Sequence, residues 1–122
     1  MPVTLAAALR IGRAFPGVEE STAWGVPALK VHGKLMACVP THKSAEPDSL
    51  LFRVDRRERP ALLAEAPHLY YAPDHYLGYD GVLVRLRHLT PELAHDLFAM
   101  AHRFVSPRRP AKAARPRGSS SR

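Results

Sequence analysis

The side chains most able to do chemistry are Cys38, seven histidines and the adjacent acids Glu19 and Glu20. Cys38 lies in the apolar stretch 36–39, where no neighbour supplies the base or positive helix end that a nucleophilic thiolate needs. Neighbouring strand residues point to opposite faces, so Glu19 and Glu20 cannot act together on one substrate. We therefore expect a buried thiol, solvated acids and no catalytic residue.

The histidines do not form a metal-ligand pattern. His95 and His102 share one face of the last predicted helix, but two helical turns hold them roughly 10 Å apart, too far for one ion. Both lie opposite the apolar stripe of that helix, where we expect them to face solvent. The sequence has no histidine pair spaced by four and no Cys-His cluster. We predict no metal site, no cofactor and no enzymatic activity.

Four further side chains are candidates for a surface or cleft that binds without catalysis: Trp24, His75, Tyr76 and Tyr79. Aromatic rings with a polar tip can stack on nucleic-acid bases. The alternative is that Trp24 and at least one tyrosine cap the core, where such rings bury well with one hydrogen bond. Core capping is the favoured interpretation.

Cationic and apolar residues alternate along the predicted strands. The apolar set, which should point at the helices, is Leu29, Val31, Phe52, Val54, Val82, Val84 and Leu86. The opposite face would then carry Lys30, His32, Arg53, Arg85 and Arg87. This face could contact phosphates. Equally, its cations could pair across strands with Glu20 or Asp48, or be solvated.

Apolar periodicity and turn signals define the elements that would position these residues. A helix is predicted from its N-cap Thr4 to Pro16-Gly17, rather than a secretory signal, because no basic segment precedes the apolar stretch. Strands follow at 20–24, 28–32, 34–39 and 49–54, with a break at 25–27 and a tight turn at His32-Gly33.

The second half is predicted to add a helix, two strands and a longer helix. A capping-box pattern at 55–58 precedes the first of these helices, so either its first turn is distorted by Pro60 or it begins near Pro60, and it ends about Glu65. The strands span 69–72 and 82–87. Thr90 caps the last helix, which ends at 106–107. A common core is expected from Leu9, Phe15, Leu93, Leu97, Phe98 and Phe104. The order α-β-β-β-β-α-β-β-α predicts an α+β fold, with helices on one face of a single antiparallel sheet.

Composition separates a domain at 1–107 from a basic tail at 108–122 that lacks core-forming residues. The net charge is +7, yet without the tail twelve basic residues face eleven acidic ones. The tail cations that could bind nucleic acid are Arg108, Arg109, Lys112, Arg115 and Arg117. A single cysteine favours a cytoplasmic location, and no apolar run is long enough to span a membrane. A monomer is slightly favoured.

Several separated segments resemble the MmcQ/YjbR family. Residues 18–31 (VEESTAWGVPALKV) are similar to its first signature, which 33–37 continue. Residues 49–55 look like the family's next strand, and 73–79 and 82–86 look like its final loop and strand. The resemblance covers about 5–107. It implies an α+β fold similar to the CyaY-like double-wing arrangement.

The resemblance also implies DNA binding. We therefore expect a non-enzymatic DNA-binding protein of low sequence specificity that contacts phosphates through the cationic sheet face and the basic tail. The alternative is a protein-interaction or small regulatory module with no nucleic-acid role.

Overall fold

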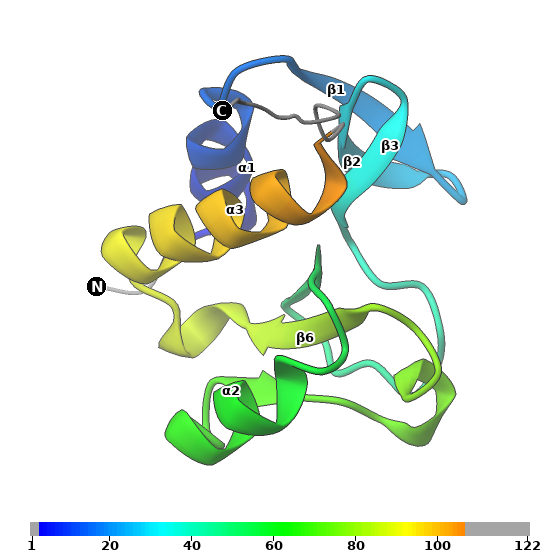
Figure 1. Cartoon of the computed structure of the whole chain (residues 1–122), viewed down its shortest axis with the longest axis vertical. Coiled ribbons are helices and arrows are strands. Elements are labelled where there is room, and N and C mark those ends of the chain that lie inside the picture. The colour runs from blue at the N-terminus through cyan, green and yellow to red at the C-terminus, as the bar shows by residue number, and fades with distance from the viewer. Residues whose placement is uncertain (1–2, 107–122) are drawn as a thin grey trace, which may run out of the picture.

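A computed structural model describes residues 3–106. Three helices and six strands follow one another in the predicted order (Figure 1). They are α1 (Leu5–Arg13), β1 (Val18–Ala23), β2 (Val26–Val31), β3 (Lys34–Cys38), β4 (Ser49–Arg53), α2 (Arg59–Glu65), β5 (Tyr70–Tyr71), β6 (Gly81–Arg85) and α3 (Pro91–Val105). Short 3-10 turns, η1 (Asp74–Tyr76) and η2 (Leu86–His88), flank β6 in the sequence.

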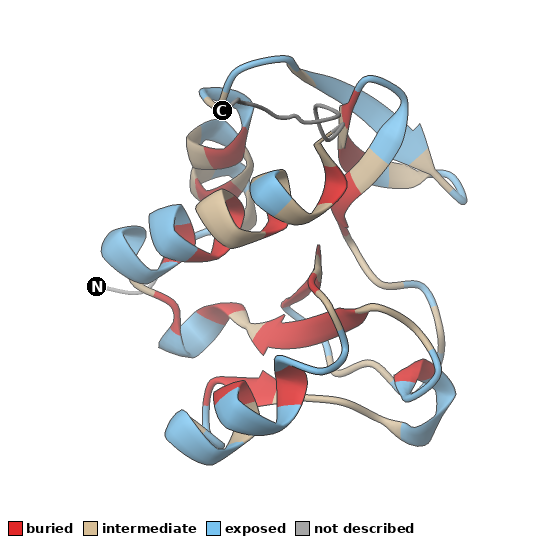
Figure 2. Ribbon diagram, viewed as in Figure 1, coloured by how far each residue is buried: buried red, intermediate tan, exposed pale blue. Residues whose placement is uncertain are grey.

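The six strands form one sheet in the order β1-β2-β3-β4-β6-β5, and every neighbouring pair is antiparallel. The α+β class with a single antiparallel sheet is therefore confirmed. The longest central pairing joins β4 to β6, from Ser49 opposite Arg85 to Arg53 opposite Gly81. Figure 2 shows the contrast this order produces, since the edge strand β1 is almost wholly exposed and β6 is buried.

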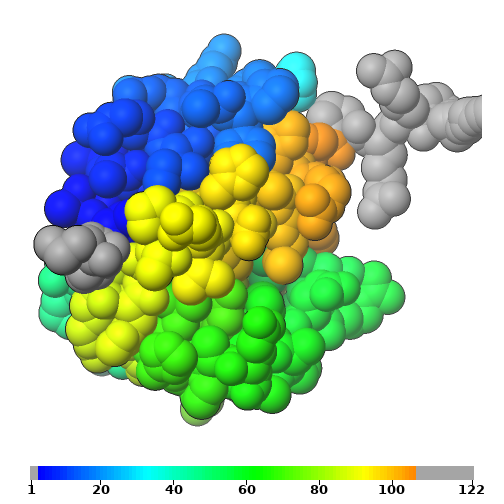
Figure 3. All heavy atoms as spheres, turned by 90° about the vertical axis from the view of Figure 1, so that its left-hand side faces the viewer, coloured from blue at the N-terminus to red at the C-terminus, as the bar shows by residue number. Residues whose placement is uncertain are grey.

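The helices pack on one face of the sheet. Phe98 of α3 is fully buried and meets Phe52 of β4 edge to face, with ring centroids 4.7 Å apart. Gly12 lets α1 approach closely, because a Cβ there would lie 2.4 Å from Phe98 Cε1. In Figure 3 the atoms of α3 lie between those of α1 and the green segment that contains α2. Leu62 of α2 joins the same core.

Local sequence explains where the elements begin and turn. The Thr4 and Thr90 hydroxyls accept the amide protons of Ala7 and Leu93, which caps α1 and α3 as predicted. The predicted turn at His32-Gly33 is present, with φ of 51° and 79°. A second turn of the same kind, at 24–25, joins β1 to β2, so the break predicted at 25–27 is shorter and Val26 and Pro27 already belong to β2. Two successive positive φ values are typical of type I′ hairpin turns.

Two expectations about single residues are wrong. Leu93 is 37% exposed and does not join the core. His95 is exposed, as predicted, although its ring lies near Phe15 at a centroid distance of 5.0 Å. His102, by contrast, is half-buried, with its ring centroid 5.7 Å from that of Phe15. His102 Nε2 also lies 2.7 Å from the Pro16 carbonyl oxygen, so α3 holds the end of the α1 segment.

Within residues 3–106, no helix combines the length and apolar character needed to cross a membrane. The predicted basic tail, including Arg108, Arg109, Lys112, Arg115 and Arg117, lies outside the described residues.

Candidate functional site

The sheet face without helices carries a second, smaller apolar cluster. Its buried members are Ala28, Cys38, Leu51, Tyr76 and Leu83. Tyr71, Tyr79 and Ala45 pack against them while remaining partly exposed. This face is therefore covered by the loops at 39–48 and 72–80 and is not an open row of cations.

A pocket of about 260 Å³ opens on this helix-free face. Its strand residues are Cys38 and Leu51, which are almost fully buried. Its remaining lining residues are Trp24, Val39, Pro40, Thr41, His42, His75, Tyr76 and Tyr79. The structure thus brings together all four predicted surface or cleft residues, which come from the β1–β2 turn and the loop before β6.

Trp24 and Tyr76 behave in opposite ways. Trp24 lies at the tip of the β1–β2 turn and is 70% exposed, so the expectation that it caps the core is wrong. Tyr76 is only 7% exposed, so it does cap the small cluster. An exposed tryptophan beside a pocket lined with rings leaves one of its π-faces available to a ligand.

Two imidazoles stack at the pocket. The His42 and His75 ring centroids are 3.5 Å apart and their planes differ by 8°. Tyr76 meets both rings edge-on, at 6.3 and 4.9 Å. The Nδ1 atom of His42 accepts the Ser44 amide proton at 3.1 Å, which orients the ring.

The surroundings of the His42–His75 stack disfavour the protonated form of His42. Desolvation lowers the pKa of His42 below its usual 6.5, and the nearby His75 and Lys43 lower it further. Sequence reasoning missed His42 because it lies in a polar loop, 33 positions before its partner. Only the pairing of β3 with β4 and of β4 with β6 brings the two loops together.

The wall formed by Tyr76 and Tyr79 is fixed from behind by Arg59, the first residue of α2. Its side chain is buried, with the whole residue 7% exposed. Its terminal nitrogens donate to four carbonyl oxygens at 2.6–3.2 Å, those of Tyr76, Leu77, Tyr79 and Gly81. A buried cation is thereby satisfied by backbone oxygens alone, and the segment 76–81 gains a fixed path.

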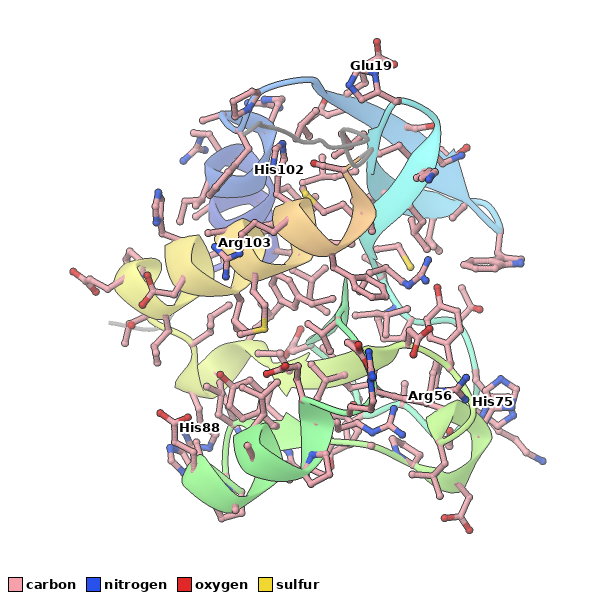
Figure 4. All side chains as sticks on the ribbon, in the orientation of Figure 1. Glu19, Arg56, His75, His88, His102 and Arg103 are labelled. Atoms are coloured by element: carbon pink, nitrogen blue, oxygen red, sulfur yellow. The ribbon has the colours of Figure 1, made fainter. Side chains whose placement is uncertain are left out.

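A second arginine supports the same loop from its exposed side. Arg56 Nη1 donates to the Gly78 carbonyl oxygen at 2.7 Å, and its Nε lies 3.3 Å from Asp80 Oδ1. Figure 4 shows Arg56 on the same side of the molecule as His75, away from His102 of α3. Neither Arg56 nor Arg59 was predicted, because their partners, which are backbone carbonyls and the Asp80 carboxylate, follow about twenty residues later in the sequence.

The predicted cationic face is not assembled as one surface. Arg85 pairs with Glu46, with Nε–Oε1 and Nη2–Oε2 distances of 2.9 and 2.8 Å, and its guanidinium lies 4.4 Å from the Tyr71 ring centroid. Arg87 is not on a strand: β6 ends at Arg85, and Arg87 lies in η2, 3.8 Å from Glu46. The partner is thus Glu46, not the expected Glu20 or Asp48.

The other two strand cations differ from each other. Arg53 Nε donates to the Asp80 carbonyl oxygen at 2.8 Å, and its guanidinium lies 4.8 Å from the Tyr79 ring centroid. Lys30 is half-buried on β2 and lies opposite Glu19 in the strand register. Arg53 therefore contacts the pocket-lining ring of Tyr79 without lining the pocket itself, while Lys30 lies on a different strand. The role predicted for these cations in binding phosphates stays a prediction.

Cys38 is fully buried, and burial raises the pKa of its thiol to about 11, although nearby Arg53 acts in the opposite direction. A thiol with so high a pKa keeps its proton at pH 7. Within residues 3–106, no group of three or more His, Cys, Asp or Glu side chains is placed to hold a metal ion.

The family model described as YjbR matches residues 13–104, three quarters of the chain. The chain belongs to the YjbR family. No curated protein and no solved structure matches it.

Proposed function

We propose that the chain is a non-enzymatic DNA-binding protein with little sequence specificity, which binds through its helix-free face and its basic segment at 108–122. The observation that carries the proposal is the exposed Trp24 beside the ring-lined pocket. Sequence-tolerant binding of nucleic acid combines cations that follow the backbone with aromatic faces on which bases stack.

Cations are available near the pocket as well as in the tail. Lys43 is exposed and close enough to His42 to lower that residue's pKa. Lys30 extends the same face on β2, and the segment from Pro107 onward adds six cations. Arg53 and Arg85 are less suited to phosphates, because each already binds groups of the fold.

The buried Cys38 supports the non-enzymatic part of the proposal. A thiol with a pKa of about 11 is protonated at neutral pH and cannot serve as a nucleophile there. The pocket's imidazoles are stacked on each other, and His42 is also hydrogen-bonded to Ser44.

The test is a salt titration of labelled duplex DNA with four proteins. They are the full chain, a truncation after Pro107, the full chain with Lys30→Ala and Lys43→Ala, and a control with Arg10→Ala and Arg103→Ala on the helix side. Each phosphate contact contributes roughly 0.9 to the slope of log K against log salt.

We expect the truncation to bind weakly. The slope of log K against log salt should become shallower in the Lys30/Lys43 variant, by up to the contribution of about two phosphate contacts. The control pair removes the same charge and should keep its slope. If the full chain binds neither duplex nor single-stranded DNA even at low salt, the proposal fails and a protein-interaction or small regulatory module replaces it.

A further inference from the structure

We infer that the pocket holds one unpaired base, so that the partner of the helix-free face is single-stranded rather than duplex DNA. This inference rests on the proposed function and narrows it. It is carried by the size of the pocket, the rings that line it and the rigidity of its walls.

The volume of the pocket limits its occupant. Sites for drug-sized ligands are commonly about 300–1,000 Å³, and this pocket has about 260 Å³. One ring system fits such a space, whereas a duplex does not. In a duplex the base faces are stacked on their neighbours, so only an unpaired or flipped base can offer a ring.

The chemistry of the lining suits a flat, polar-edged ring. Trp24, Tyr79 and the stacked imidazoles supply ring surfaces, and Thr41 supplies a hydroxyl. No carboxylate lines the pocket among the described residues, so an electron-rich base edge or a flanking phosphate meets no negative charge there. Lys43 and Arg53 place positive charge beside the rings.

The pocket is built before any ligand arrives. The β1–β2 turn that carries Trp24 has φ values of 53° and 78°, the tight geometry of a type I′ turn. Arg59 fixes the opposite wall through its four carbonyl partners. Because both sides are held, little conformational entropy is lost when a ring enters.

The test uses the fluorescence of Trp24, the only tryptophan in the chain. The full-length protein is titrated at low salt with a short oligodeoxythymidylate and with a duplex of equal length, and label anisotropy is followed alongside tryptophan emission. We expect the single strand to change the Trp24 emission and to bind roughly 5-fold or more tightly than the duplex, because base–ring stacking has an effect of that size.

Two substitutions test the pocket directly. Trp24→Asn removes the ring while keeping a residue suited to positive φ, and it should weaken single-strand binding by roughly 5- to 150-fold. His75→Ala should weaken it as well. Leu93→Ala, an exposed apolar residue on the helix side, is the control and should bind as the unaltered chain does. Melting temperatures confirm that each variant is folded.

The failures are distinguishable. If single strand and duplex bind equally, Trp24 emission stays constant and Trp24→Asn binds unchanged, the pocket inference is overturned while DNA binding stands. If neither nucleic acid binds at low salt, the proposed function and the inference fall together.

Discussion

The two faces of the sheet are built by different means. The helix-covered face buries a continuous apolar core in which Phe52, Phe98 and Leu97 are at most 2% exposed. The helix-free face buries a cluster of five apolar residues and is closed by loops that hydrogen bonds hold in place. Apolar packing is non-directional, whereas hydrogen bonds fix geometry. The first face accounts for stability, and the second can leave a shaped pocket open.

The largest expected effect is on the helix-covered face. Phe98→Ala should lower the free energy of unfolding by about 3–5 kcal/mol, because it removes a buried ring and leaves a cavity between α1 and β4. Urea denaturation measures the loss.

Leu51→Ala is the corresponding truncation on the other face, at a smaller side chain. Leu51 already borders the pocket, so water can enter the new space, and the cost should be nearer about 2 kcal/mol. Equal losses at Phe98 and Leu51 would remove the distinction between the two faces.

The next effect concerns the loop that closes the pocket. Arg59→Gln should cost about 2–3 kcal/mol, because buried carbonyl oxygens lose a charged donor. Amide hydrogen exchange across 76–81 should speed up more than exchange in α1.

Arg59→Lys retains the charge but has fewer donors than the guanidinium, so it should recover only part of the stability. If exchange at 76–81 is unchanged in Arg59→Gln, the loop is held by its other contacts and the role given to Arg59 is wrong.

The covered face was the more predictable of the two. The helix caps at Thr4 and Thr90 and the turn at His32-Gly33 are local signals, and all are confirmed. Periodicity also identified Leu97 and Phe98 as core residues. It failed for Leu93, in the first turn of α3, because a position on the apolar stripe near a helix end can extend past the sheet.

The pocket was predictable only in part. Residue type alone identified Trp24 and the His-Tyr loop at 73–81 as candidates. The prediction that Trp24 is buried in the core was wrong. His42, Arg59 and the Arg85–Glu46 pair depend on contacts between residues 17–39 positions apart. No periodic pattern encodes such contacts. The alternation of apolar and cationic residues also predicted that Arg87 lies on a strand. In the structure β6 ends at Arg85 and a 3-10 turn follows.

The smallest effect is expected at Cys38, which borders the pocket yet is fully buried. Cys38→Ala removes one sulfur and should cost about 1 kcal/mol or less, with DNA binding unchanged. Because Cys38 is the only cysteine in the sequence, the rate of reaction with a thiol reagent measures the accessibility of this one side chain. Native protein should resist a thiol reagent at pH 8 and react only after unfolding, whereas fast labelling of the native protein would show that the pocket wall opens.

The alkaline side of the stability curve gives Cys38 a second, independent signature. The unfolded thiol ionises near 9.0 and the native one at about 11, because burial disfavours the thiolate. The native state therefore holds the proton more tightly, so this contribution to stability is complete below pH 9.0 and is lost as the pH rises toward 11. Tyr76 and Tyr79, whose pKa values burial also raises, add to the same decline.

Cys38→Ala should consequently lose less stability than the unaltered chain between pH 8 and pH 11, measured by urea denaturation at each pH. Parallel curves for the two proteins would mean that the thiol reaches water in the native state, and that the helix-free face is looser than its hydrogen bonds indicate.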